Sequence, residues 1–492
     1  MIRLDPFAVT VAVILLWLGN TAVGVAAEEP KPKALPPIPL TLTEVLAWVD
    51  GSHPLLKGSG TEKIVARGRL LKALGAFEPT LVNDYELERL VKSGKTVSVG
   101  FNDSFLDVRH PWGARAIGGF RLGIGPVEIA DLAVGPSKTN QPIMGLFLPL
   151  LRGFMVNPEN AELKRSELAD PRADIQIAQS RQELFLGAAM QYWDWVAAWK
   201  LVDVQRRAVR VADDRAKQVE QRAKAGAVAP LDVVEANQEV QRRKETLIAA
   251  QRVVEQEQYK LSLFLWDGDA PATPPGERVP DIPKPVELPS PEAVLADKVT
   301  AKSVRPEVRE VAIEAKLNNI DLELAKNNLL PRLDAEAEPS RKPGEFVLGL
   351  GYRFGIEMRI PFLQRRARGE VLEAQGKADR FVLVQKFREQ QVVVDVDNAL
   401  SAIERAKQRI TVATQSLQLA RTLEEGERFR FTLGATSVLF VNLRERNAVD
   451  SENQWIRAQA DYQNALALYQ WAIGAWAKAP AAVTPVNYRP TK

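Results

Sequence analysis

Two kinds of hydrophobic pattern alternate along this chain. Between Leu348 and Ile360, apolar residues take every second position and Gly, Arg or Glu fill the positions between them. A two-residue period of this length predicts a strand with one apolar and one polar face. Upstream, Leu333, Ala335 and Ala337 alternate with charged residues, and "PSRKPG" from Pro339 supplies a turn. The sequence therefore predicts a β-hairpin over about 331–362.

The first half of the chain repeats this theme more loosely. Strands are expected at Thr80 to Leu90, Trp112 to Ile124 and Ile143 to Leu150. The segment at about 92–142 has no counterpart in the second half, and we interpret it as an extended strand with a long external loop. Together the hairpins predict about four strands per chain.

Long helical tracts occupy most of the rest. They are expected at 157–226, 228–266, 364–434 and 436–474, with shorter helices at 54–75 and 306–330 and around Val45 and Val294. Only Gly226 and Gly434 interrupt the long tracts, which predicts two helical hairpins. A coiled-coil-like seam of apolar and small residues at steps of three and four is expected at Leu186, Met190, Trp193, Ala197, Leu201, Val204, Ala208 and Val211.

The two halves are an internal duplication. Pro54 and Pro306 match at an offset of 252, whereas the glycine turns are 208 apart, so the first half carries about 40 extra residues. We divide the chain into 28–270, with its insertion at about 79–150, and 271–474, which opens with a Pro-rich tract. A tail follows at 475–492.

Composition excludes several function classes. The 65 Lys and Arg residues against 62 Asp and Glu are mixed along the helices, so no nucleic-acid surface is expected. There is no cysteine, and the two histidines have no partners at metal-ligand spacing, so neither a metal, a cofactor nor an enzyme activity is predicted. Gly349-Leu350-Gly351 lies inside a strand and is no dinucleotide loop.

The first 27 residues read as a cleavable signal peptide. Arg3 precedes a 12-residue apolar run, and small residues end at Ala27. No later stretch approaches 18 uninterrupted apolar residues, so a membrane crossing is expected as strands. Each hairpin lies isolated between helices without an apolar partner, which favours a lipid-facing sheet over a soluble sandwich.

One chain supplies too few strands to close a barrel. Copies must share it, and an open conduit favours three, with about 12 strands in all. The predicted fold is mainly α, with long hairpins in an α-barrel and a small membrane part in a shared trimeric β-barrel. The alternative is a soluble periplasmic coiled-coil adaptor or structural protein.

The chain resembles the TolC-like outer-membrane efflux proteins. The likeness rests on "LTLTEVLAWV", "RPEV" at Arg305, the paired glycines, the run from Arg430 to Leu439 and "YQWAIG" ending at Gly474. It implies a homotrimer in the outer membrane of a Gram-negative-type cell, in contact with lipid. Its helical part would lie in the periplasm, and its partners would be a periplasmic adaptor and an inner-membrane pump.

The resemblance also implies roles for the glycine turns, as the periplasmic tips where the adaptor binds. The corresponding residues here are Gly226, Ala227, Val228, Pro230, Leu231, Gly434, Ala435, Thr436, Ser437, Val438 and Leu439. Family members often constrict the entrance with aspartates after the second tip, where this chain has Phe440 and Asn442. Asp232 of the first tip is the alternative candidate for this constriction. Its other interpretation is a carboxylate at the start of a helix, where it interacts favourably with the helix dipole. The sequence does not identify the exported cargo or the pump class, nor does it show whether an acidic ring gates the entrance.

Overall fold

The computed structural model describes residues 39–92, 95–124, 127–129, 132–134, 140–274, 276–339 and 352–477. These residues fall in one compact unit, Pro39–Lys492. The predicted signal peptide, the Gly349-Leu350-Gly351 segment and most of the tail at 475–492 lie outside the described residues.

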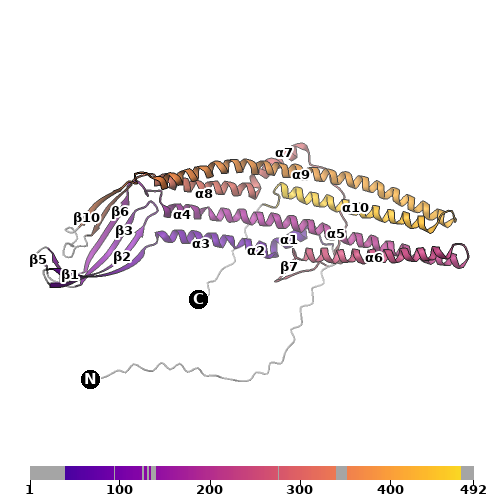
Figure 1. Cartoon of the computed structure of the whole chain (residues 1–492), viewed down its shortest axis with the longest axis horizontal. Coiled ribbons are helices and arrows are strands. Elements are labelled where there is room, and N and C mark those ends of the chain that lie inside the picture. The colour runs from indigo at the N-terminus through magenta and orange to yellow at the C-terminus, as the bar shows by residue number, and fades with distance from the viewer. Residues whose placement is uncertain are drawn as a thin grey trace, which may run out of the picture. The chain divides into compact units, whose positions relative to one another are not determined.

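Two long helical hairpins form most of this unit. Helix α5 (Ala169–Lys224) returns as α6 (Pro230–Ser262), and α9 (Arg365–Thr432) returns as α10 (Val438–Ala472). Helix α10 packs against α5 as well as α9, which joins the two hairpins along their length. Both hairpin turns lie at the end of the helices opposite the β-sheet (Figure 1).

Shorter helices accompany the hairpins. These are α1 (Leu42–Ser52), α2 (Pro54–Gly60), α3 (Glu62–Leu74), α4 (Pro158–Glu167), α7 (Pro291–Val304) and α8 (Pro306–Asn328), with 3-10 turns at Gly75–Phe77 and Gly276–Arg278. The predicted unbroken helix from 157 to 226 is wrong, because α4 ends before Leu168 and α5 begins after it. Pro171 explains the break, since its ring has no N–H and clashes with the preceding turn. The predicted helix at 54–75 is likewise divided, at Thr61.

A six-stranded antiparallel sheet extends from one end of the helices. Its strands are β1 (Thr80–Lys92), β2 (Lys95–Arg109), β3 (Arg115–Ile124), β6 (Asn140–Pro149), β9 (Arg332–Pro339) and β10 (Tyr352–Arg359), in that order. Two small ribbons pair β4 (Val127–Ile129) with β5 (Leu132–Val134), and β7 (Trp266–Asp267) with β8 (Ala270–Pro271). The expected count of about four strands is therefore too low. The insertion at about 92–142 supplies β2 and β3 to the middle of the sheet. Strand β3 agrees with the strand expected at Trp112 to Ile124, whereas β2 takes the place of part of the expected external loop.

The two faces of the sheet differ in chemistry. Apolar side chains that are largely exposed occupy one face of five strands: Leu81, Tyr85, Leu87, Leu106, Val108, Phe120, Leu122, Met144, Leu146, Phe354, Ile356 and Met358. The opposite face carries ion pairs between strands, such as Arg121 with Asp103 and Arg115 with Asp107. The alternation predicted from the sequence is confirmed over the described strands, and no described part of the chain covers their apolar side.

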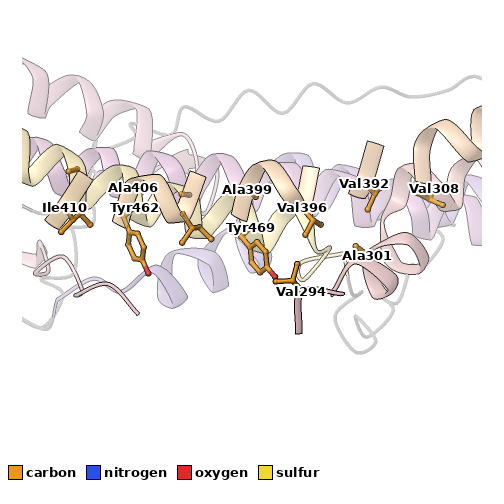
Figure 2. Close-up of a cluster of buried hydrophobic side chains, with 14 residues drawn as sticks. Val294, Ala301, Val308, Val392, Val396, Ala399, Ala406, Ile410, Tyr462 and Tyr469 are labelled. Carbon is orange, nitrogen blue, oxygen red and sulfur yellow. The ribbon is translucent and has the colours of Figure 1, made fainter. Parts of the chain in front are cut away.

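The helical core lies where the hairpins and short helices meet. Figure 2 shows one cluster, in which Val396 and Ala399 of α9 lie beside Tyr469 of α10, and Ala406 and Ile410 lie beside Tyr462. The hydroxyl of Tyr469 donates a hydrogen bond to the Asp297 carboxylate at 2.7 Å. This bond links α7 to α10. Burial and this carboxylate raise the pKa of Tyr469 above its usual range.

The buried stripe of α5 is wider than the predicted seam. Trp193, Ala197, Val204 and Ala208 are buried as expected, whereas Met190 is exposed and Leu186, Leu201 and Val211 are half-buried. Burial extends to residues such as Tyr192 and Trp195, because α5 also contacts α1, α2, α3 and α8.

No helix within the described residues combines the length and the apolar character that crossing a membrane would require.

Candidate functional site: the two hairpin tips

Two five-residue turns, which we call the first tip (Ala225–Ala229) and the second tip (Leu433–Ser437), connect the long helices. Gly226 and Gly434 both have φ of 73°. No atom lies within 4 Å of a Cβ built on either glycine, so the backbone conformation, and not a lack of space, requires glycine there.

Hydrogen bonds of the same kind close both tips. The Gly226 and Ala227 amides donate to the carbonyls of Ala223 and Arg222, at 3.0 and 2.9 Å. The Gly434 and Ala435 amides make the same bonds, to Phe431 and Arg430, at 3.1 and 2.9 Å. This six-to-one and five-to-two pattern satisfies the last carbonyls of a helix. The predicted repetition of the glycine turn is confirmed down to its hydrogen bonds.

The helices restart differently after the two tips. Pro230 is the first residue of α6, where a missing N–H costs nothing. The Asp232 carboxylate accepts from the Ala229 amide at 3.1 Å, so it caps the helix. After the second tip, Ser437 is the N-cap of α10 and its side chain makes no capping bond.

The tips also contact each other. A buried cluster joins all four long helices next to the turns. It consists of Val219, Ala236, Phe431, Val438 and Val441. Arg222 of α5 donates to the Phe431 carbonyl at 2.9 Å, and its guanidinium lies over the Phe431 ring at 4.8 Å. The two hairpin ends therefore form a single packed block.

Buried ion pairs reinforce this block. The carboxylate of Glu445 on α10 accepts from Arg215 on α5 at 2.8 Å and from Arg428 on α9 at 3.0 Å. Arg215 and Glu445 are almost completely buried, with side chains 8% and 6% exposed. Burial lowers the pKa of Arg215, and the charge of Glu445 opposes that shift.

A second carboxylate repeats the arrangement. Glu239 of α6 accepts from Arg243 at 2.8 Å and forms an ion pair with Arg446 of α10 at 3.3 Å. Glu239 and Arg243 lie four residues apart, the spacing that brings side chains together on one helix face. The partner Arg446 comes from a different helix.

The predicted docking residues are mostly, but not all, accessible. Gly226, Ala227, Pro230, Leu231, Gly434, Ala435, Ser437 and Leu439 are exposed. Val228 and Thr436 are half-buried, and Val438 is buried in the cluster that joins the tips. Exposed Val234, Leu433 and Phe440 enlarge the apolar surface around the turns.

The three residues proposed for an entrance constriction are in different environments. Asp232 is half-buried and caps α6, and Phe440 is 53% exposed. Asn442 is only 2% exposed, and its amide nitrogen has no hydrogen-bond partner among the residues that the structure describes. Asn442 could face a lumen only if the helices around it separated.

A hollow of about 710 Å³ lies where the sheet meets the helices, on the charged face of the sheet. Four arginines at the helix end of the strands line it, each in an ion pair with a carboxylate, so its wall carries charges of both signs. The pairs are Arg109 with Glu159, Arg115 with Asp107, Arg332 with Asp334 and Arg359 with Glu357. This surface was not predicted, since its strands converge only in the fold.

The profile of a known protein family, outer membrane efflux protein, matches residues 135–265 and 299–474, more than half of the chain. No curated protein sequence matches this chain significantly. Strands β1, β2 and β3 lie before residue 135, outside the matched ranges.

Several solved structures share the fold at low sequence identity. The CmeC outer membrane channel of Campylobacter jejuni is 13% identical, with a TM-score of 0.64 over 88% of this chain and 85% of that one. The outer membrane protein VceC of Vibrio cholerae is 14% identical, with a TM-score of 0.63 over 88% and 96%. The open state of the MtrE outer membrane channel of Neisseria gonorrhoeae is 17% identical, with a TM-score of 0.59 over 88% of both chains.

Proposed function

This chain belongs to the outer membrane efflux protein family, and on that premise we propose that three copies form the passive exit duct of a tripartite export system. The chain is a TolC-like efflux channel of the Gram-negative outer membrane, and the family is one of channels and not of enzymes. Trimer formation, adaptor binding and the inner-membrane pump are the parts that we propose.

Family membership decides between the two functions that the sequence left open. A soluble periplasmic adaptor or structural coiled coil would not match an outer-membrane channel family in both halves of the chain. The uncovered apolar face of the sheet also agrees with a lipid-facing surface.

The outward face of α9 supports assembly with further copies. One apolar stripe of α9 is buried within the chain, including Val392, Val396 and Ile403. A second stripe is exposed at intervals of about one, two, three and five helical turns. Its members are Leu372, Leu383, Phe387, Val394, Val412, Leu419 and Leu423, each at least 52% exposed. A long apolar stripe that nothing covers marks an interface, and we assign it to neighbouring copies.

The tips carry the adaptor-binding part of the proposal. Exposed apolar side chains such as Leu231, Leu433 and Leu439 surround turns that the chain itself holds rigidly through Arg222 and Phe431. A rigid block with uncovered apolar residues suits recognition by another protein, because little order is lost on binding. This combination is the observation that carries the proposal.

Opening of the duct would separate the packed hairpins. The buried pair between Arg215 and Glu445 opposes that movement, since α5 and α10 lie on its two sides. Energy would come from contacts with the adaptor and pump, which would bias the helices towards an open arrangement. A constriction at Asp232, Phe440 and Asn442 stays a prediction.

Charge substitutions at the tips test adaptor binding. Leu231→Glu combined with Leu439→Glu should abolish export in cells that contain the cognate adaptor and pump, while trimer mass and conductance of the purified protein are retained. Val299→Glu, on a 71% exposed residue of α7, is the matched control and should export normally. Normal export by the double variant would contradict adaptor binding at the tips.

A further inference from the structure

The sheet has two open edges of opposite direction. Its order runs from β1 to β10, and among the described residues neither strand has a partner on its outer side. All neighbouring strands are antiparallel, so the six strands alternate and β1 runs opposite to β10. In a ring of copies, β10 of one chain and β1 of the next would therefore also be antiparallel.

The strand ends are staggered across the sheet. A row drawn through paired residues leads from Thr80, the first residue of β1, through Asp107 and Ile117. It continues through β6 and β9 and reaches Arg353 in β10. The end of β10 next to the helices is Arg359, so the row has shifted by six residues (359 − 353) over five strand-to-strand steps.

This stagger corresponds to a strand tilt. In a closed ring the six residues are spread over six steps, five within the sheet and one at the seam, which gives a tilt of about 35° with about 3.3 Å per residue and about 4.8 Å between strands. Closed barrels in membranes have tilts of about 35–45°. The ends of β1 and β10 next to the helices would then lie at one level around a common axis.

The two edges match in chemistry at this level. Pairing Thr80 of one chain with Arg359 of the next places Leu81 opposite Met358 and Tyr85 opposite Phe354. These four apolar side chains are 58–80% exposed and lie on the apolar face of the sheet. A shift by one residue would place Leu81 opposite Glu357, which belongs to the charged face.

The strands that the insertion adds are an integral part of the sheet. Arg121 of β3 binds both carboxylate oxygens of Asp103 in β2 at 2.7 Å, and it is only 6% exposed. A Cβ on Gly119 would lie 2.1 Å from the Ser104 carbonyl oxygen and 2.5 Å from the Phe105 Cα, so glycine here allows β3 to approach the backbone of β2. Any barrel built from this sheet must therefore include β2 and β3.

We propose that three copies close one barrel of eighteen strands through seams between β1 and β10, an inference that rests on the trimeric channel proposed above. Eighteen strands about 4.8 Å apart and tilted by about 35° give a backbone radius of about 17 Å, against about 11 Å for twelve strands. The outer mouth has more than twice the cross-section expected from four strands per chain, and its charged lining suits bulky, hydrated cargo.

Engineered cysteines test the seam, because the natural chain has none. Leu81→Cys combined with Met358→Cys should form disulfides between neighbouring copies on mild oxidation, since directly opposed residues meet the distance limit of about 7 Å between Cα atoms. The expected product is a covalent trimer on denaturing electrophoresis. Asn83→Cys with Ile356→Cys, the next pair on the same face, provides a second test if the first variant fails to fold.

A matched control keeps one cysteine and moves the other. Leu81→Cys with Gly355→Cys places the thiols on opposite faces and three residues out of register, so no covalent trimer is expected. A native trimer that conducts but shows no cross-link in either seam pair would overturn the eighteen-strand closure and leave the proposed channel intact. A monomer without conductance would refute the trimeric channel itself.

Discussion

Replacing Glu445 by glutamine should loosen both hairpin tips at once. Glu445 accepts hydrogen bonds from Arg215 on α5 and Arg428 on α9, so one carboxylate holds three of the four long helices together. Glutamine has nearly the same shape, and its carbonyl oxygen can still accept hydrogen bonds, but it carries no charge. Arg215 would be left buried without its counter-charge.

The burial of this pair sets the size of the effect. Removing one partner of a buried ion pair costs about 3–5 kcal/mol. Arg215 and Glu445 are 8% and 6% exposed, so water compensates little. Arg428 is 35% exposed and its contribution is correspondingly small. If this cost lowers the free energy needed to open the tips locally, amide hydrogen exchange there should accelerate about 100-fold to 4,000-fold.

Hydrogen exchange followed by mass spectrometry measures this directly on the detergent-solubilised channel. Peptides covering both tips should lose protection, while the core around Tyr462 and Tyr469 keeps its slow exchange. Glu220→Gln is the control, since its pair with Lys224 is exposed on both sides and contributes little. An exchange rate in Glu445→Gln within about threefold of the natural protein would refute the view that the buried pair holds the tips.

Two further predictions concern backbone conformation and pH. Gly434→Ala should destabilise the second tip by about 1–2 kcal/mol because its φ is 73°, whereas Gly376→Ala, inside α9 with free space around it, should stabilise by about 0.5–1 kcal/mol. Thermal melting compares the two variants, and equal melting temperatures would contradict the argument. His53 caps α2 by accepting from the Leu55 amide at 3.3 Å, and burial lowers its pKa below 6.5. Protons then bind the unfolded state preferentially, so stability should fall as the pH drops below about 6.5. In His53→Asn, which caps without titrating, this pH-dependent loss should disappear.

The tip glycines could be predicted from the sequence because their signal is local. A glycine that ends a long helical pattern, followed by small residues and a new pattern, indicates a left-handed residue and a reversal. The ion pairs above the tips could not be predicted in the same way. Arg215 and Glu445 lie 230 residues apart, and their charges look like any exposed helix face until α5 and α10 are packed together.

Strand β2 was missed because its pattern is mixed. Asn102 and Ser104 share a face with Leu106, while the apolar Phe105 belongs to the charged face. Gly119 lies opposite Phe105 on β3 and places no side chain on that face. An apolar residue on the polar face breaks the two-residue period, and the strand then no longer follows from its own sequence.

The contact between the tips makes length a shared property of the two halves. Arg215 lies eleven residues before Gly226, and Glu445 lies eleven residues after Gly434. Seven residues added to α5 and α6 alone would carry Arg215 about 10 Å along the helix axis, away from Glu445. The distance that the helices span can therefore change only when both halves change together, so the two helical hairpins must keep matching lengths.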